Sequence, residues 1–543
     1  MSAVIASRCG HGLLKAFMQG GLQRFERQAH DLEAVQRRLL RDWSQRFVRS
    51  PRGRNSGIRP DDSWEQITAR LPGSHYRDYQ DDLERQRREN QQRLIDSPIS
   101  RYQPTSGSTS AIKWIPYTRA FLGELDQAIS PWIGDLYRQY PQIAQGSHYW
   151  SLSWIPSALR ESSSADLNDD MQLMSLGKRL IAGLTQTAPP GIALAGSADD
   201  SLFATLAFLV ADTRLSVMSI WSPTFGLGLL EQLGQCREEL AEVLSRGHWG
   251  QRSTAMATLR CPRSTAAAQR LRAWDGQADP AFFAELWPQL ALVSAWDTAA
   301  AAPWAQRLRQ LLPQAGFQGK GLWATEGVVT FPFRGCYPLA YRSHVYEFED
   351  LDSGKILPPW ALRQGQQVMP LLTTGSGFAR YRMNDILEVS GHWRTLPCFR
   401  FLGRNDGVDL VGEKISATLA QTVLDRLDYA GYLPITLLAL DDSGEGRPGY
   451  VLLLESNIEP RSLALQDLAQ QLENALLDNF HYRLARDLGQ LAAARCIAQP
   501  QMRQLYLEQA RARGMLEGNI KLEALRHWPG ELPASLRPLL QVS

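Results

Sequence analysis

The sequence predicts an α/β protein with a large N-terminal body and a smaller α+β unit at its C-terminal end. Three observations support this prediction: apolar strand-like runs alternate with helical segments, the second half contains more of these runs, and the pattern changes near Gly403. With 543 residues, 44% of them hydrophobic, the chain is long enough to divide into at least two domains with their own cores.

The first half is expected to be mainly helical. Two stretches, 13–49 and 78–94, carry apolar residues at helical spacing among many charges, which is typical of amphipathic helices that cover a larger body. The elements expected next are a helix over 118–140, a helix capped by Asp199 and Asp200 and running to about 210, a strand over 215–221 and a helix over 225–246.

The second half is expected to be richer in strands, and a domain boundary is predicted within it. The expected elements are strands over 328–333, 345–348, 386–389, 399–402, 435–440 and 450–455, a helix over 462–479, a short strand near Ala493 and a helix over 500–513. The segment GRNDG, 403–407, separates the two parts, and its Gly, Asn and Asp residues permit a backbone hinge. We therefore expect a large domain over 1–403, a hinge over 404–409 and a small α+β domain over 410–543.

Composition and charge exclude several classes of protein. A net charge of +2 gives no reason to expect nucleic acid or a membrane surface as a partner, and we find neither a long apolar span nor a convincing signal peptide. The six cysteines are widely separated and form no CxxC pair, so neither a disulfide framework nor a zinc site is expected. A reducing compartment, the cytoplasm, fits this pattern.

Lysine is rare in this chain, since only seven of the 58 basic residues are lysine. Lysine is a compact charge on a flexible stem, so each one has a raised chance of a role that arginine cannot fill. Lys15, Lys178, Lys320 and Lys355 stand in polar or turn contexts and are expected to be solvated surface groups.

The segment TSGSTSAIKWIPYT, 105–118, has the composition of a phosphate-binding loop. Its small and hydroxylated residues allow close approach of backbone N–H groups to phosphate oxygens, and Lys113 adds a positive charge. The order of residues is not that of a Walker loop, because the serines and threonines precede the lysine. Taken alone, the segment is also compatible with a surface linker.

Three further segments carry groups suited to nucleotide chemistry. Ala324-Thr325-Glu326-Gly327 places a hydroxyl and a carboxylate before a strand, and Asp385, after RYRMN, could accept hydrogen bonds from ribose hydroxyls. Arg404 and Asp406 precede the turn Gly412-Glu413-Lys414-Ile415, whose lysine could meet a phosphate. The structural alternatives are a strand with a surface salt bridge for RYRMND and an exposed hairpin lysine for Lys414.

Taken in this order, the segments resemble the adenylate-forming (ANL) enzymes, and more closely the auxin-responsive Gretchen Hagen family of acyl acid amido synthetases, as a bacterial-type member. The similar segments, along nearly the whole chain, are TSGSTSAIKWIPYT, ATEG, TTGSGFARYRMNDILEV, FRFLGRND, LVGEKI, PGYV (448–451) and GNIK (518–521). Two departures stand out: Asn384 replaces the usual Gly, and Gly375-Ser376 replaces bulkier residues before Gly377. The resemblance implies a large adenylate-forming domain of β-sheets and a distorted barrel packed with helices, and a small mobile α+β C-terminal domain.

The resemblance also implies ATP and Mg²⁺ and assigns roles to matching positions. It places the phosphates and adenylate against Ser106, Gly107, Ser108, Thr109, Lys113, Ala324 and Thr325. It places the ribose on Asp385 with Arg404 nearby, the metal on Glu326, and the α-phosphate on Lys414, with Lys521 assisting one half-reaction. Glu326, Lys414 and Lys521 are therefore the expected catalytic residues.

The expected activity is that of a ligase that activates a carboxylic acid as acyl-AMP, releases pyrophosphate and transfers the acyl group to the amine of an amino acid or to another amine. Formation of the adenylate replaces a poor leaving group by AMP, and positive groups would stabilise the crowded phosphorus centre. An acid–thiol ligase that uses coenzyme A or a carrier protein, and a nucleotide-binding protein without catalysis, are the alternatives.

The acyl acid is expected to lie near Trp221, Ser222 and Phe225, which would suit an aromatic or apolar acid. Aromatic residues at such spacing are also ordinary core residues, so a packing role remains the alternative. A second aromatic cluster, formed by His148, Tyr149, Trp150 and Trp154, is compatible with either the same pocket or the core. The identity of the acid, the amine and the oligomeric state do not follow from the sequence.

Overall fold

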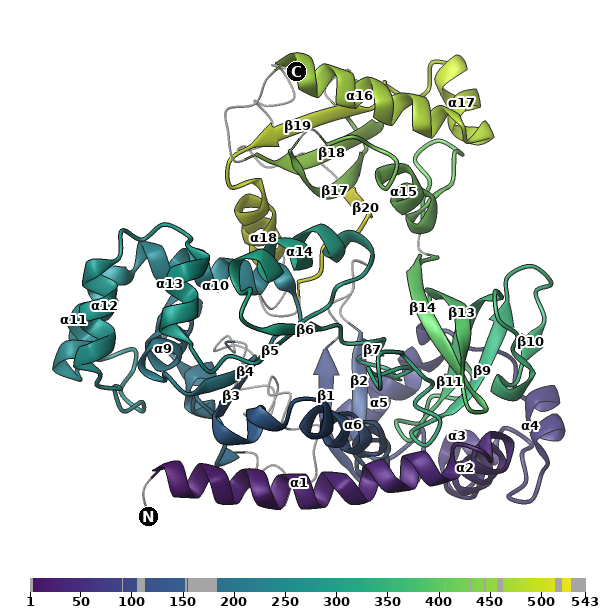
Figure 1. Ribbon diagram of the computed structural model, residues 1–543. Coiled ribbons are helices and arrows are strands. Elements are labelled where there is room, and N and C mark those ends of the chain that lie inside the picture. Colours follow the sequence, from purple (N-terminus) through teal and green to yellow (C-terminus); the bar gives the residue numbers. More distant parts are fainter. Residues whose placement is uncertain are drawn as a thin grey trace. The chain divides into compact units, whose positions relative to one another are not determined.

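The protein divides into two compact units. The computed structural model (Figure 1) describes residues 3–89, 91–104, 113–151, 154, 183–405, 407–429, 431–443, 446–456, 462–512 and 520–528. The first unit is made of Met1–Trp296, Leu308–Met383 and Leu387–Arg400, and the second of Asp297–Arg307, Asn384–Ile386 and Phe401–Ser543. Helices alternate with strands in both, so the predicted α/β class is confirmed.

A parallel four-stranded sheet forms one part of the first unit. Its strands, in spatial order, are β3 (Ser147–Trp150), β4 (Leu215–Ser219), β5 (Leu292–Ser294) and β6 (Gly316–Gln318). Parallel neighbours need crossover connections. The helices between these strands are α9 (Ala198–Ala211), α10 (Pro223–Gln235), α11 (Arg237–Arg246), α12 (Thr265–Ala273), α13 (Pro280–Leu286) and α14 (Ala302–Leu311).

An antiparallel sheet and two hairpins complete the strands of this part of the chain. The sheet has the order β10 (Ile356–Leu357), β9 (Val345–Asp350), β11 (Gln367–Thr373), β13 (Asp385–Trp393) and β14 (Leu396–Arg404), with β12 (Tyr381–Arg382) also paired to β11. The hairpins are β1 (Ile99–Pro104) with β2 (Trp114–Thr118), and β7 (Trp323–Ala324) with β8 (Gly327–Val328). The short β7–β8 hairpin carries the ATEG segment at its turn.

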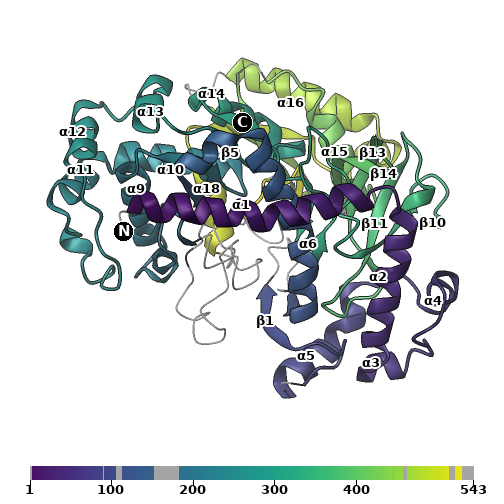
Figure 2. The ribbon, with the colours of Figure 1, turned by 60° about the horizontal axis from the view of Figure 1, so that its bottom comes forward.

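The α-helices of the chain up to β3 belong to the first unit. They are α1 (Ala3–Gln28), α2 (Leu32–Phe47), α3 (Pro51–Arg54), α4 (Trp64–Arg70), α5 (Gln80–Glu89) and α6 (Arg119–Gln139). Helix α1 packs against α6 and crosses in front of it in Figure 2. The two helices approach closely because Gly21 and Gly134 have no side chain at the contact. A Cβ atom at Gly21 would lie 2.4 Å from the Cβ of Ser130, and one at Gly134 would lie 3.0 Å from the Cβ of Leu22.

The second unit contains a mixed four-stranded sheet. Its order is β19 (Arg495–Gln499), β18 (Gly449–Glu455), β17 (Leu433–Leu440) and β20 (Leu525–Trp528), antiparallel only between β17 and β18. The other elements are β15 (Gly407–Val408), β16 (Ile415–Ser416), α15 (Ala417–Leu424), α16 (Ser462–Leu477), α17 (Phe480–Asp487) and α18 (Met502–Ala512). Tyr450 from β18 and Tyr482 from α17 are fully buried in its apolar core.

Most predicted elements are present, and the amphipathic stretch 13–49 lies in helices α1 and α2. Three details were wrong. The helix expected over 225–246 is two helices, divided at Cys236. Helix α9 is capped by Ser197, whose Oγ accepts from the N–H of Asp200, while Asp199 and Asp200 occupy its first turn. The strand expected over 328–333 ends at Val328. None of the described helices is both long and apolar enough to cross a membrane.

Candidate active site

The turn of the β7–β8 hairpin connects two other predicted site segments within the first unit. The carbonyl of Thr325 accepts a 3.2 Å hydrogen bond from the hydroxyl of Tyr117 in β2. Oε1 of Glu326 lies 3.4 Å from the hydroxyl of Tyr381 in β12. Burial, with the nearby charge of Glu326, raises the pKa of Tyr381, so this phenol stays protonated and donates. Ala324, Thr325 and Glu326 are each only partly buried.

An aromatic group joins the end of the phosphate-type segment to the same place. Nζ of Lys113 lies 5.8 Å from the ring centroid of Tyr76, and the Tyr76 hydroxyl accepts a 2.8 Å hydrogen bond from the N–H of Trp114. The Tyr76 ring meets Phe378 edge to face, and Phe378 stacks on Tyr381 at 4.9 Å. Lys113, ATEG and the RYR segment therefore lie around one aromatic group, whereas Ser106, Gly107, Ser108 and Thr109 lie outside the described residues.

The arginines of the RYR segment hold the fold together. Arg380 makes a bidentate ion pair with Glu347 in β9, at 2.7 and 3.0 Å, and its Nη1 donates to the carbonyls of Thr68 and Leu71. Burial raises the pKa of Glu347, and Arg380 opposes that shift. Arg382 pairs with Glu349. The salt-bridge alternative therefore applies to both arginines, although the Arg380 pair is buried and does not lie on the surface.

Asp385 and Arg404 belong to neighbouring strands and to the second unit. Asp385 begins β13, Arg404 ends β14, and both side chains are partly buried. The carbonyl of Asn384 accepts a 2.6 Å hydrogen bond from the N–H of Asn405. Among the described residues of this segment, Gly377 and Arg380 have positive φ and Asn384 does not, so the Asn that stands in place of the usual Gly needs no left-handed backbone here.

The turn that carries Lys414 is organised by its neighbour Glu413. The carboxylate of Glu413 is fully buried and accepts from the N–H groups of Leu410 and Val411, both at 2.9 Å, and from the hydroxyl of Tyr450. Lys414 follows with a left-handed φ of 50° and an exposed side chain. Hence the buried carboxylate fixes the turn while the lysine points to solvent. Asp406 lies outside the described residues.

Lys521 also belongs to the second unit. It is exposed, between the buried Ile520 and strand β20. Gly518 and Asn519, which precede it in the GNIK segment, lie outside the described residues.

Trp221, Ser222 and Phe225 lie at the carboxyl end of strand β4. Ser222 occupies the N-cap position of α10, and its hydroxyl is 2.6 Å from that of Thr224. Ser222 and Phe225 are buried, and Trp221 is partly exposed. Ligands of open parallel sheets bind outside the carboxyl ends of the strands, so this placement suits a substrate site.

Lys320 occupies the same end of the sheet, although the sequence analysis placed it on the surface. It is 1% exposed, and its Nζ lies 4.9 Å from the ring centroid of Trp221. That expectation was wrong because the adjacent Gly319 and Gly321 suggested a turn, whereas strand β6 delivers the lysine into a group of tryptophans. The rarity of lysine was the available signal.

A magnesium site made only of protein groups is not found in the part of the chain described here. No cluster of three or more His, Cys, Asp or Glu residues there could hold a metal ion. Mg²⁺ in nucleotide sites is commonly held by one or two carboxylates together with phosphate oxygens and water. The single carboxylate of Glu326 at the hairpin turn fits that kind of site.

Comparison with known proteins identifies three successive matching regions. The GH3 family N-terminal domain matches residues 21–317, the GH3 family central domain 337–404 and the GH3 family C-terminal domain 416–529. A protein of Oryza sativa subsp. japonica named "Probable indole-3-acetic acid-amido synthetase GH3.7" is 28% identical over 157 residues, 27% of this chain and 25% of that protein. The indole-3-acetic acid-amido synthetase GH3.10 of Arabidopsis thaliana is 23% identical over 235 residues, 38% of this chain and 40% of that protein.

The fold is also similar to solved structures along nearly its whole length. The AtGH3.15 acyl acid amido synthetase in complex with 2,4-DB has a TM-score of 0.79 at 15% identity, with 97% of this chain and 96% of that chain covered. The matched regions of the two curated relatives span a quarter and two fifths of their lengths, so those matches are partial.

Proposed function

Because the chain belongs to the GH3 family, the Gretchen Hagen family that its motifs resemble, we propose that it is an ATP-dependent acyl acid amido synthetase. The proposed reaction has two steps. The carboxylate of an acyl acid attacks the α-phosphorus of ATP, which gives acyl-AMP and pyrophosphate. An amine, in this proposal an amino acid, then attacks the acyl carbon and displaces AMP, so that an amide is formed.

The observation that carries this proposal is the convergence at the β7–β8 hairpin. Its turn residues Thr325 and Glu326 are hydrogen-bonded to Tyr117 and Tyr381, which belong to the other two segments expected to meet the nucleotide in the first unit. Segments more than 200 residues apart in sequence thus surround one place, as an adenylate site requires.

The side chains have distinct proposed tasks. The small residues Ser106 to Thr109 and Lys113 would hold the phosphates, with Ala324 and Thr325 beside the adenylate. Asp385 would accept from the ribose hydroxyls, with Arg404 nearby. An exposed lysine on a rigid turn is a suitable group to stabilise a phosphorus centre that gains negative charge, and this is the role proposed for Lys414. Lys521 would serve one of the two half-reactions.

Glu326 is the proposed ligand of Mg²⁺. When bound with the nucleotide, the ion would neutralise phosphate charge. The Tyr381 hydroxyl at 3.4 Å from Oε1 would restrict the orientation of the Glu326 carboxylate.

The segment 404–409 is the proposed hinge between a large domain, 1–403, and a small domain, 410–543. Movement at this hinge would allow the small domain to take different positions in the two half-reactions. A cytoplasmic location is proposed because all six cysteines are free.

Pyrophosphate release tests the proposed activation step. Purified protein with ATP and Mg²⁺ is offered a panel of aromatic, indole-type and aliphatic acids, and at least one acid should stimulate pyrophosphate release above the acid-free rate. The best acid is then combined with amino acids, with other amines and with coenzyme A, and products are identified by mass. An amide product supports the proposal; a thioester alone would favour the acid–thiol ligase, and no acid-dependent release would refute both.

A further inference from the structure

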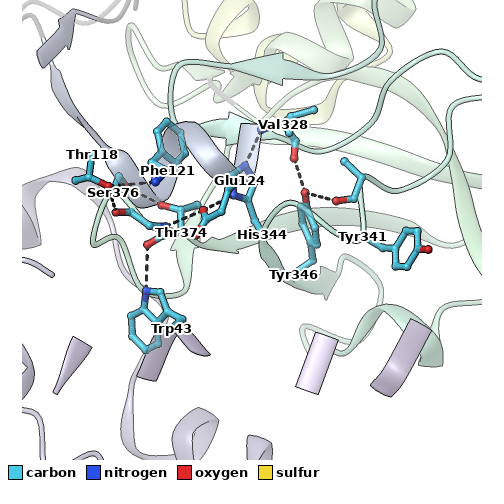
Figure 3. A network of polar contacts seen from close by, with 12 residues as sticks. Trp43, Thr118, Phe121, Glu124, Val328, Tyr341, His344, Tyr346, Thr374 and Ser376 are labelled. Carbon is cyan, nitrogen blue, oxygen red and sulfur yellow. Dashed lines mark hydrogen bonds and ion pairs between the residues drawn. The ribbon is translucent and has the colours of Figure 1, made fainter. Parts of the chain in front are cut away.

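The buried His344 and the largely buried Glu124 form a pair beside two of the segments proposed to meet the nucleotide (Figure 3). Nδ1 of His344 lies 2.9 Å from Oε2 of Glu124, and the His344 side chain is fully shielded from solvent. The imidazole stacks on Phe121 of α6 with ring centroids 5.5 Å apart. This packing fixes the plane of the ring, and with it the direction of both nitrogen atoms.

One arm of the pair reaches the ATEG hairpin. The backbone N–H of Val328 donates to Nε2 of His344 at 3.2 Å. Nε2 must therefore be the unprotonated nitrogen, so the proton resides on Nδ1 and is donated to Glu124. Tyr346 also holds Val328 in place, because its hydroxyl donates to the Val328 carbonyl at 2.6 Å.

The other arm reaches the TTGSG loop. The same Oε2 of Glu124 accepts a 2.8 Å hydrogen bond from the N–H of Gly375. The Gly375 carbonyl accepts from the hydroxyl of Thr118, which also caps helix α6, and the Thr374 carbonyl accepts from the indole of Trp43. The loop is thus held from three directions: Glu124 links it to the His344 side chain, and the pairing of Thr373 with Val345 links it to the same strand β9.

Two glycines of these segments lie directly against the pair. A Cβ at Gly327 would lie 2.9 Å from Nε2 of His344 and from Cδ1 of Leu372, and a Cβ at Gly375 would lie 2.7 Å from Oε1 of Glu124 and from the backbone N of Phe121. The absence of side chains at both positions lets the backbone of the two segments come this close to the imidazole and the carboxylate.

We propose that His344 and Glu124 are positioning residues for adenylation, which fix the ATEG hairpin and the TTGSG loop relative to each other. This inference rests on the proposed function for its kinetic consequences. The pair bonds to the backbone of both segments, so its proposed contribution to the rate is geometric: a shift of about 1 Å in a positioned group can cost about 100-fold.

The two arms can be broken separately by nearly isosteric substitutions. His344→Asn places an amide near Nδ1, which keeps the donor to Glu124 and removes the acceptor of the Val328 N–H. His344→Gln places its amide near Nε2, which keeps the Val328 acceptor and removes the donor to Glu124. Glu124→Met removes both oxygen atoms at similar length and should reproduce the effect of His344→Gln on the loop.

Hydrogen–deuterium exchange of the full chain provides a readout independent of activity. His344→Asn should increase exchange mainly in 323–329, and His344→Gln and Glu124→Met mainly in 373–379. The matched control is Asp42→Asn, because Asp42 lines the same cavity of about 430 Å³ as Glu124 and His344 but bonds to neither segment through its side chain. This control should leave both segments unchanged.

The kinetic test measures acid-dependent pyrophosphate release. Each of the three variants should lose about ten- to a hundred-fold in kcat/KM for ATP. The two histidine variants each lose one buried hydrogen bond, so their thermal unfolding midpoints should fall by only about 2–4 °C. Identical exchange changes from His344→Asn and His344→Gln, or changes in neither segment, would overturn the positioning role. A different outcome is also informative. If the variants show the segment-specific exchange changes but the wild-type protein releases no pyrophosphate with any acid, the proposed function is refuted and the structural link stands.

Discussion

Lys320 and Ser219 form a buried polar contact at the carboxyl end of the parallel sheet. The ammonium donates to the Ser219 hydroxyl at 2.5 Å, and the rings of Trp132, Trp150 and Trp221 lie 5.3, 5.6 and 4.9 Å from it. Burial of an ammonium is costly, and the hydroxyl oxygen and the negative faces of the indoles offset part of that cost. Lys320 thus contacts strand β4 through Ser219 and also contacts the ring of Trp221, the residue proposed to line the acyl-acid site.

Lys320→Met is expected to weaken acid binding while the protein stays folded. Methionine fills a similar volume without a charge to desolvate, so the free energy of unfolding should change by less than about 1.5 kcal/mol. Loss of the cation that holds the Trp221 ring, worth about 1 kcal/mol, should raise the KM for the acid about five-fold and leave the KM for ATP unchanged. Urea unfolding and pyrophosphate release test both parts, with the exposed Lys355→Met as control. An unchanged KM for the acid would contradict the specificity role.

Lys414→Ala should abolish most of the activity without affecting stability. The side chain is exposed, so its removal leaves the core of the second unit untouched. Loss of a charge that stabilises the transition state should lower kcat for pyrophosphate release about 100- to 1,000-fold. Lys355→Ala, another exposed lysine, is the control for generic loss of charge. If Lys414→Ala kept wild-type turnover, another group would have to supply that charge.

Much of the fold could be predicted because its elements carry local signals. Helix α6 begins directly after Thr118, a residue whose hydroxyl caps it, and ends at Gln139 as its apolar spacing indicates. The break between α1 and α2 could not be predicted, because Gln28 to Leu32 contains neither Gly nor Pro. There the turn depends on packing against the rest of the unit.

The candidate site likewise contains residues that local sequence signals predict and residues that they do not. The turns that bear Glu326 and Lys414 follow from glycine, polar residues and motif order, all of which are local. His344 and Glu124 are 220 positions apart, and Lys320 and Ser219 are 101 apart, so no spacing in the sequence relates them. Contacts of this kind depend on how the sheets and helices assemble, which is why the buried Lys320 was expected on the surface.

Glu413→Ala should destabilise the second unit, because three donors lose their acceptor. The N–H groups of Leu410 and Val411 and the hydroxyl of Tyr450 would be left without the carboxylate, at a cost of about 3 kcal/mol in total. Tyr450→Phe removes one of these bonds and should cost about 1 kcal/mol. Both are measured by chemical unfolding, and Glu413→Ala should also lower adenylation through the displaced Lys414. Equal stability of Glu413→Ala and wild type would show that the turn forms without its buried carboxylate.

His148 is expected to make the first unit sensitive to acid. Burial, with repulsion from the nearby His11, lowers the pKa of His148 to about 3, and its Nε2 is 3.0 Å from the carbonyl of Ile143. The pKa in the unfolded chain is the ordinary 6.5, so the contribution to stability is complete above pH 6.5 and is lost as the pH falls toward 3. The slope is about 1.4 kcal/mol per pH unit, so His148 alone should remove about 2 kcal/mol between pH 7.5 and pH 5.0. His148→Gln keeps a donor near Ile143 but cannot titrate, so its unfolding free energy should fall less over this range in urea titrations. The exposed His30→Gln should follow the wild type, and parallel pH profiles for wild type and His148→Gln would show that another group causes the acid sensitivity.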